Sequence, residues 1–208
     1  MKKITIIGAS GHGKVAADIA SLNGYDEIEF LDDNETLKFC GKYPIVGKSN
    51  CVLFIKNSDV FVAIGNCSVR KKLMEQINYK SLVTLVHPSA VIADDVQIGK
   101  GTIVMAGTVI NTGTRIGNGV IINTSSSIDH DCVVDDFVHV AVGSHLCGTV
   151  KVGMDTWVGA GAIIINNVEV CSECFIGAGA VVTKNLENPG LYIGVPAKFV
   201  KHKNLTNM

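Results

Sequence analysis

An aliphatic side chain stands at every sixth position from Val86 to Val182, and no position in the series is skipped. A period of six matches neither the 3.6-residue turn of a helix nor the two-residue alternation of a long strand. It is typical of short strands joined by tight corners, the hexapeptide form of a parallel β-helix. The series consists of Val86, Ile92, Ile98, Val104, Ile110, Ile116, Ile122, Ile128, Val134, Val140, Leu146, Val152, Val158, Ile164, Val170, Ile176 and Val182.

A second set of positions favours the same architecture, because a small side chain or valine stands four residues after each of the first sixteen aliphatic residues. If three repeats form one triangular coil, residues 18 apart in the sequence stack in interior ladders. Successive coils would then lie about 4.8 Å apart, which is the spacing of hydrogen-bonded strands. The small residues fill the narrow interior, where bulkier side chains would overpack it. The sequence therefore predicts a β-helix with a C-terminal tail over residues 83–208.

The first 82 residues follow a different pattern, in which strand-like and helix-like segments alternate. Strands are expected at residues 3–7, 28–31 and 60–64. Helices are expected from the glycine-rich turn to Gly24 and again at residues 68–76. This alternation predicts a small α/β domain with a parallel, Rossmann-like sheet over residues 1–82.

Composition and charge narrow the possible partners. The formal net charge is −1, so no strong field draws the chain to nucleic acid or to an anionic membrane. No apolar run reaches the length of a membrane span, and we expect a cytoplasmic protein without membrane insertion. Among the seven cysteines, Cys132 and Cys174 fall at interior positions and are expected to be reduced, core-filling thiols. No set of His, Cys and carboxylates has metal-ligand spacing, so no metal is predicted.

The N-terminal segment contains a candidate ligand site at the carboxyl ends of its strands. The turn Gly8–Gly13 reads GASGHG, and glycines before a helix allow a backbone to approach a phosphate. Asp32 and Asp33 follow the second strand, where an acidic side chain could meet a ribose or a base. Gly65 follows the third strand. The alternative is a set of turn residues without a ligand, and the absence of GxGxxG disfavours a dinucleotide-dependent oxidoreductase.

Within the repeats, His130 is the strongest candidate for chemistry. It stands between Asp129 and Asp131 near a corner, and a carboxylate beside an imidazole can raise its basicity and fix its tautomer. Gly148, 18 positions further on, leaves His130 uncovered by a side chain. The alternative is a surface histidine among acids. His139 is nine residues away, which is half a coil, so the two histidines can share a site only across a subunit interface.

These motifs together resemble a known family. The hexad pattern resembles the left-handed β-helix acyltransferases. Combined with GASGHG, LDD, AIGN, SIDHDC and GVPAK, it is similar to the bacterial sugar acetyltransferases that include UDP-4-amino-sugar N-acetyltransferases (PglD-like) and sialic acid O-acetyltransferases (NeuD-like). The resemblance implies a left-handed β-helix, homotrimers, acetyl-CoA as co-substrate, and a nucleotide sugar bound partly by the N-terminal domain.

The resemblance also implies roles for individual residues. His130 would be the general base and Asp131 the acid that raises its basicity, although close relatives can have Glu there. The positions that match contacts to UDP are Ser10, Gly11, His12, Asp32, Asp33 and Gly65. The positions that match contacts to acetyl-CoA are His139, Ala160 and Ala178.

The expected function is acetyl transfer from acetyl-CoA to the amino group of a UDP-linked amino sugar, of the 4-amino-4,6-dideoxy type, in bacterial glycan biosynthesis. Two alternatives stay open at this stage. One is O-acetylation of a sialic acid, which uses the same acyl chemistry on a hydroxyl. The other is a non-catalytic, trimeric binding module.

Overall fold

The computed structural model describes residues 1–55 and 57–201, and it divides the chain into two compact units. The first is Met1–Pro88 and the second begins at Ser89, six residues after the boundary that the sequence predicts. The end of the predicted tail, residues 202–208, lies outside the described residues.

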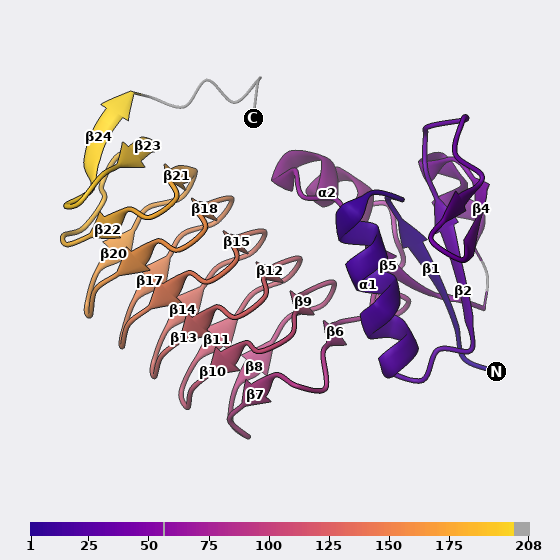
Figure 1. Cartoon of the computed structure of the whole chain (residues 1–208), viewed down its shortest axis with the longest axis horizontal. Helices are drawn as coiled ribbons and strands as arrows, with labels where there is room; N and C mark the ends of the chain where they lie inside the picture. Colours follow the sequence, from indigo (N-terminus) through magenta and orange to yellow (C-terminus); the bar gives the residue numbers. More distant parts are fainter. Residues whose placement is uncertain (56, 202–208) are drawn as a thin grey trace. The chain divides into compact units, whose positions relative to one another are not determined.

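The first unit contains a five-stranded sheet with strand order β3-β4-β2-β1-β5 (Figure 1). Strand β1 lies between β2 and β5 and pairs in parallel with both, as the sequence predicts. The edge strand β3 and its neighbour β4 form an antiparallel hairpin that the sequence pattern does not reveal. The strands of this unit are β1 (Lys3–Ile7), β2 (Glu27–Leu31), β3 (Phe39–Cys40), β4 (Tyr43–Gly47), β5 (Asp59–Val62) and β6 (Leu85–Val86).

In the described residues of the first unit, three helices accompany the sheet. They are α1 (Gly11–Leu22), the 3₁₀ helix η1 (Ser49–Phe54) and α2 (Cys67–Met74). Helix α1 contacts β1 and β2, η1 contacts β2, and α2 contacts β5. The side chain of Asn66 accepts a hydrogen bond from the Val69 amide (3.0 Å) and so caps the start of α2.

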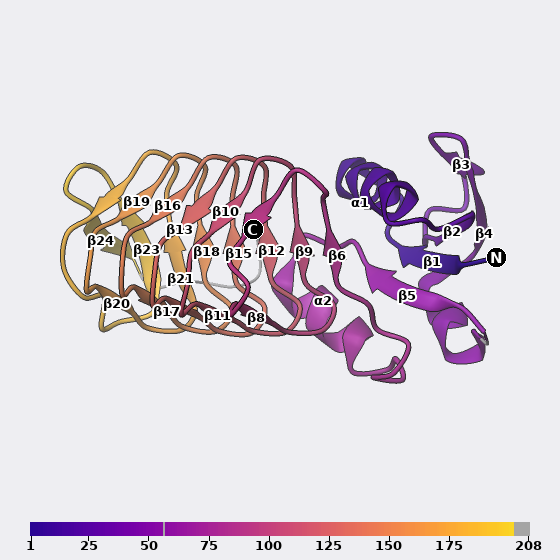
Figure 2. The ribbon, with the colours of Figure 1, turned by 90° about the horizontal axis from the view of Figure 1, so that it is seen from below.

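The second unit is a parallel β-helix whose short strands form three sheets (Figures 1 and 2). The β7 sheet contains β7 (Val91–Ile92), β10 (Val109–Ile110), β13 (Ser127–Ile128), β16 (His145–Leu146), β19 (Ile163–Ile164) and β22 (Val181–Val182). The β8 sheet contains β8 (Gln97–Ile98), β11 (Arg115–Ile116), β14 (Val133–Val134), β17 (Lys151–Val152) and β20 (Glu169–Val170). Within this unit, the β9 sheet contains β9 (Ile103–Val104), β12 (Ile121–Ile122), β15 (His139–Val140), β18 (Trp157–Val158), β21 (Cys174–Ile176), β23 (Gly190–Ile193) and β24 (Lys198–Lys201).

The coil length of 18 residues is confirmed by the register of the strands. Ile110 pairs with Ile128, and Ile122 pairs with Val140, so identical positions of successive repeats stack. The aliphatic series is buried from Val104 onwards, and so are the small residues four positions later, from Thr102 onwards. The fold prediction of an α/β domain followed by a parallel β-helix is therefore confirmed.

Interior threonines hold the corners of the β-helix together. The hydroxyl of buried Thr102 donates to the Gly117 carbonyl (2.8 Å) and accepts from the Val120 amide (3.0 Å). It therefore joins both ends of the corner in the next coil. Two more threonines make the same pair of bonds, and we call this arrangement the threonine clamp. They are Thr114, which joins Asp129 to Cys132, and Thr156, which joins Cys171 to Cys174.

The clamp predicts a difference between two substitutions at Thr102. Thr102→Val keeps the shape but removes the hydroxyl, so the part-buried Gly117 carbonyl and the buried Val120 amide lose a partner. Each such group costs about 1–3 kcal/mol, and we expect the free energy of unfolding to fall by at least that amount. Thr102→Ser keeps the hydroxyl and should lose less. Denaturant unfolding of both variants tests this, and equal stability of Thr102→Val and the wild type would contradict it.

Candidate active site

His130 and Asp131 form a hydrogen-bonded pair at the corner that follows β13. The Nδ1–H of His130 donates to Oδ2 of Asp131 (2.8 Å), because an ionised carboxylate can only accept. The second ring nitrogen, Nε2, then carries the lone pair. Both side chains are about half exposed, with 49% of His130 and 61% of Asp131 accessible. The corner thus presents an imidazole lone pair to incoming molecules.

A second carboxylate supports the same histidine. Oδ1 of Asp129 accepts from the His130 amide and from Nδ2 of Asn111, both at 2.8 Å. The hydrogen bond to Asp131 and then the negative charge of Asp129 raise the pKa of His130 above its ordinary value. The hydrogen bond from Asn111 is the largest cause that lowers the pKa of Asp129. Sequence reasoning gave Asn111 no role, although its spacing of 18 residues from Asp129 predicts the contact.

Two glycines make room for the pair, as the sequence predicts for Gly148. A Cβ atom on Gly148 would lie 2.5 Å from Nε2 of His130, so the imidazole rests on bare backbone in the coil above. A Cβ atom on Gly113, in the coil below, would collide with Oδ1 of Asp131. Asp131 itself adopts a positive φ of 58°, a conformation that Asp and Asn tolerate better than most residues.

His139 lies on β15, in a different sheet from the strand that precedes His130. Its ring packs against Trp157 with centroids 4.0 Å apart, and Trp157 stacks on Phe175 at 5.8 Å and 11°. Nε2 of His139 lies 3.3 Å from Nδ2 of Asn123. The three rings form an outward-facing column along the β9 sheet, and His139 is buried at one end of it.

Ala160 and Ala178 stack in successive coils at the corner after the β9 sheet. The Gly179 amide donates to the Ala160 carbonyl (2.9 Å), which fixes their register. Both alanines are exposed, and the residues that follow them, Gly161 and Gly179, would offer open space to a Cβ atom within the described part of the chain. This column therefore leaves a shallow strip without bulky side chains along the coils.

In the first unit, Asp32 anchors the glycine-rich turn. Its Oδ2 accepts from the Ala9 amide (2.7 Å) and its Oδ1 accepts from the Asn34 amide (2.9 Å). The turn is tightly packed, because a Cβ atom on Gly13 would collide with the Gly8 carbonyl. The carboxylate of Asp33 likewise accepts two hydrogen bonds, from the amide and the hydroxyl of Ser49, both at 2.9 Å. Both acids thus bind protein groups at this edge of the sheet.

The other predicted nucleotide-binding residues are more open. Ser10 is exposed and precedes α1 without a side-chain capping bond. Gly11 and Gly65 have no neighbour within 4 Å of a built Cβ atom among the described residues, and neither has a positive φ. Neither glycine is therefore required by local packing or by an unusual backbone conformation.

His12 is the one predicted residue in this region with a strongly shifted pKa. Burial, together with the charge of Arg70, lowers the pKa of His12 to about 4. Its Nε2 is buried and has no hydrogen-bond partner among the described residues. The imidazole is therefore neutral near pH 7, and Nε2 is available to a ligand that reaches it. Arg70 is fully buried and donates to the carbonyls of Ile64 (2.7 Å) and Gly65 (2.8 Å).

Among residues 1–55 and 57–201, no group of three or more His, Cys, Asp or Glu side chains could hold a metal ion. The described helices are all too short or too polar to cross a membrane.

The fold and the His130–Asp131 corner define a class of protein, the hexapeptide-repeat transferases. Residues 149–184 match the family described as bacterial transferase hexapeptide (six repeats). Residues 3–77 match the family described as PglD N-terminal domain.

Three known proteins narrow this class. The acetyltransferase domain of PglB from Neisseria gonorrhoeae, solved with acetyl coenzyme A, is 36% identical with a TM-score of 0.92, over 96% of this chain and 99% of that one. A mutant of the perosamine N-acetyltransferase from Caulobacter crescentus, solved with CoA and GDP-perosamine, is 35% identical with a TM-score of 0.90, over 97% and 98%. The UDP-N-acetylbacillosamine N-acetyltransferase of Bacillus subtilis is 34% identical over 113 residues, 51% of this chain. That match covers 52% of the Bacillus protein, about half of its length.

The chain therefore belongs to the family of acetyl-CoA-dependent sugar N-acetyltransferases that combine a PglD N-terminal domain with a hexapeptide β-helix. The predicted family is confirmed. The relatives described above are N-acetyltransferases or an acetyltransferase domain, and none of them favours the sialic acid or binding-module alternative.

The pair predicts how His130 titrates. Asp131→Asn keeps the shape and tolerates the positive φ, but it removes the negative charge that favours the imidazolium. We expect the pKa of His130 to fall, and an NMR titration of its ring protons measures the shift. An unaltered pKa of His130 would show that Asp131 does not support it in solution.

Proposed function

We propose that the chain transfers the acetyl group of acetyl-CoA to the amino group of a UDP-linked amino sugar, of the 4-amino-4,6-dideoxy type, with His130 as the general base. The observation that carries this proposal is the His130–Asp131 pair, in which Nδ1–H is bound to a carboxylate and Nε2 is left as the acceptor. An acceptor of this kind suits an acyl transfer to an amine, where one proton must leave as the new bond forms.

The chemistry follows from the pair. The sugar amine attacks the thioester carbonyl, and Nε2 of His130 takes the amine proton as the C–N bond forms. Collapse of the tetrahedral intermediate breaks the C–S bond, and the imidazolium returns its proton to the departing thiolate. The products are an acetamido sugar and CoA. Asp131 and Asp129 stabilise the imidazolium that exists between the two proton transfers.

Acetyl-CoA binding is proposed for the column of Ala160 and Ala178, together with His139. An extended pantetheine arm needs a long strip without large side chains, and the exposed alanines followed by glycines offer one. The solved relatives that contain acetyl-CoA or CoA support the co-substrate. Because His130 and His139 belong to different sides of the β-helix, we also propose a homotrimer in which neighbouring subunits complete each site.

The nucleotide is proposed to bind in the first unit. Ser10, Gly11 and Gly65 leave open backbone at the carboxyl ends of the strands, and His12 supplies a neutral ring nitrogen. Asp32 and Asp33 hold the surrounding loops and are proposed to contact the nucleotide with their remaining lone pairs. The Bacillus relative is named for a UDP sugar, whereas the Caulobacter relative was solved with a GDP sugar. We propose the uridine nucleotide.

The direct test measures CoA release with a panel of amino sugars. We expect turnover with a UDP-linked 4-amino sugar and little with the matched GDP sugar or with a free sialic acid. His130→Ala should lower kcat by about 100- to 10,000-fold with little change in the KM for acetyl-CoA, which is the usual contribution of a positioned general base. Because the base must be unprotonated, activity should fall as the pH drops through the pKa of His130.

Each outcome of this test has one meaning. Turnover with GDP sugars alone would overturn the choice of nucleotide, and turnover with sialic acids alone would overturn the choice of acceptor. A folded His130→Ala variant with wild-type kcat would overturn the assigned base. His145→Ala is the matched control, since it removes an exposed histidine of the same β-helix.

Thr114 is expected to position the catalytic corner. Its clamp joins the Asp129 carbonyl (2.9 Å) and the Cys132 amide (3.2 Å), which are the two ends of the segment that holds His130. Thr114→Val should lower kcat by about 10- to 100-fold, because small displacements of a catalytic group are costly. Thr102→Val removes the same clamp at another corner and should lose stability but keep kcat. Thr114→Ser should restore turnover, and equal kcat values for the two valine variants would contradict the positioning role.

A further inference from the structure

The last coils contain a pair of thiols that the proposed function does not use. Sγ of Cys171 lies 3.5 Å from Sγ of Cys174, and neither cysteine forms a disulfide. Sequence reasoning placed Cys174 in the core and gave Cys171 no role, although only two residues separate them.

The backbone between the two cysteines is already folded for a bond. They occupy the first and last positions of a turn in which Glu173 has a positive φ of 61°. A β-turn brings its first and last Cα atoms within about 7 Å, which overlaps the range found in disulfides. The Thr156 clamp holds this turn, because its hydroxyl donates to the Cys171 carbonyl and accepts from the Cys174 amide, both at 3.2 Å. Closing the bond therefore requires side-chain movement more than backbone movement.

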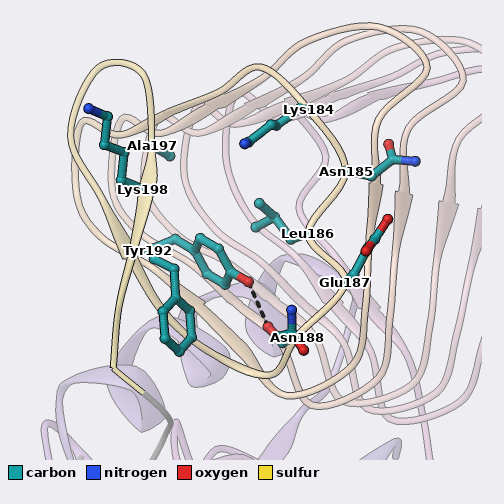
Figure 3. A pocket seen from close by; sticks show the side chains of 9 residues that line it. Lys184, Asn185, Leu186, Glu187, Asn188, Tyr192, Ala197 and Lys198 are labelled. Atoms are coloured by element: carbon teal, nitrogen blue, oxygen red, sulfur yellow. Dashed lines mark hydrogen bonds between the residues drawn. The ribbon is translucent and has the colours of Figure 1, made fainter.

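The surroundings tolerate the loss of the Cys174 thiol proton. Sγ–H of Cys174 donates to the Asn188 carbonyl at 3.7 Å, a weak bond. The same carbonyl accepts a stronger bond from the hydroxyl of Tyr192 (2.8 Å), which points at Asn188 in Figure 3. When Cys174 is oxidised, the Asn188 carbonyl therefore keeps the Tyr192 hydroxyl as its partner and avoids the cost of an unsatisfied acceptor.

Access differs between the two thiols. Cys171 is half-buried and lines a surface groove beside Lys151, Glu169 and Glu187. Cys174 is fully buried. A reagent from solution therefore reaches Cys171 first, and Cys174 is placed to attack the sulfur that has reacted.

We propose that Cys171 and Cys174 are a dithiol modification site that closes to a disulfide in the presence of a disulfide oxidant, with glutathione disulfide as the probe. The Cys171 thiolate attacks one sulfur of the oxidant, forming a mixed disulfide and releasing one glutathione thiolate. Cys174 then loses its proton and attacks the Cys171 sulfur, which releases the second glutathione. The two thiols lose two electrons and two protons, and the oxidant gains the electrons as two glutathione thiolates. This proposal is independent of the acetyl transfer.

Trypsin gives a direct readout. The sequence has no Lys or Arg between Lys151 and Lys184, so one peptide, residues 152–184, contains both cysteines and no other. The full-length chain is incubated with glutathione disulfide, unfolded, alkylated and digested. We expect this peptide to lose both alkylation sites and the mass of two hydrogen atoms, and a phosphine reductant to restore both sites.

Matched variants make the result specific. Cys171→Ser removes the accessible thiol, so Cys174 should stay alkylatable after unfolding. Cys51→Ser removes an exposed thiol elsewhere in the chain and should leave the 152–184 disulfide unchanged. Circular dichroism confirms that both variants are folded. Two outcomes would overturn the proposal: two alkylatable thiols in the oxidised wild-type peptide, or a persistent glutathione adduct on Cys171 beside a free Cys174.

Discussion

The hydrogen bonds between successive coils are the constraint on which the second unit depends. Each coil offers its strand amides and carbonyls to the coil above and below, and these groups pair only if every coil contains 18 residues. The fixed register turns sequence spacing into contact. It places His130 against the bare backbone of Gly148, and it stacks His139 on Trp157. An insertion within one coil would break these columns as well as the core.

Much of the fold of the second unit and of its candidate site could be predicted from the sequence, because the β-helix repeats. The six-residue period gives the coil, and the coil gives the neighbours of His130, including Gly148. The contact of Asn111 with Asp129 follows from the same spacing of 18 residues, although the residues adjacent to His130 do not reveal it. The hairpin of β3 and β4 could not be predicted, because β3 has only two residues and β4 contains Pro44, which disfavours a strand. The bond from Asp32 to the Ala9 amide depends on how two loops meet, which no local pattern encodes.

Aspartate has a different role in each of the two units. Asp32 accepts two backbone amides and fixes a turn, so its charge stabilises the conformation of the chain. Asp131 accepts a ring N–H while more than half of it is exposed, so its charge acts on the protonation of His130. The histidines show the same contrast. Burial keeps His12 neutral, whereas neighbouring carboxylates favour the charged form of His130.

The ring column on the β9 sheet has an optical consequence. Trp157 is the only tryptophan in the sequence, and it lies between His139 and Phe175. The emission of an indole depends on the groups that touch it, and here these are the two neighbouring rings. The tryptophan fluorescence of the unlabelled chain therefore comes from Trp157 alone. This residue lies beside His139, which is proposed to contact acetyl-CoA. A change in the surroundings of Trp157 can therefore be followed in real time through its emission.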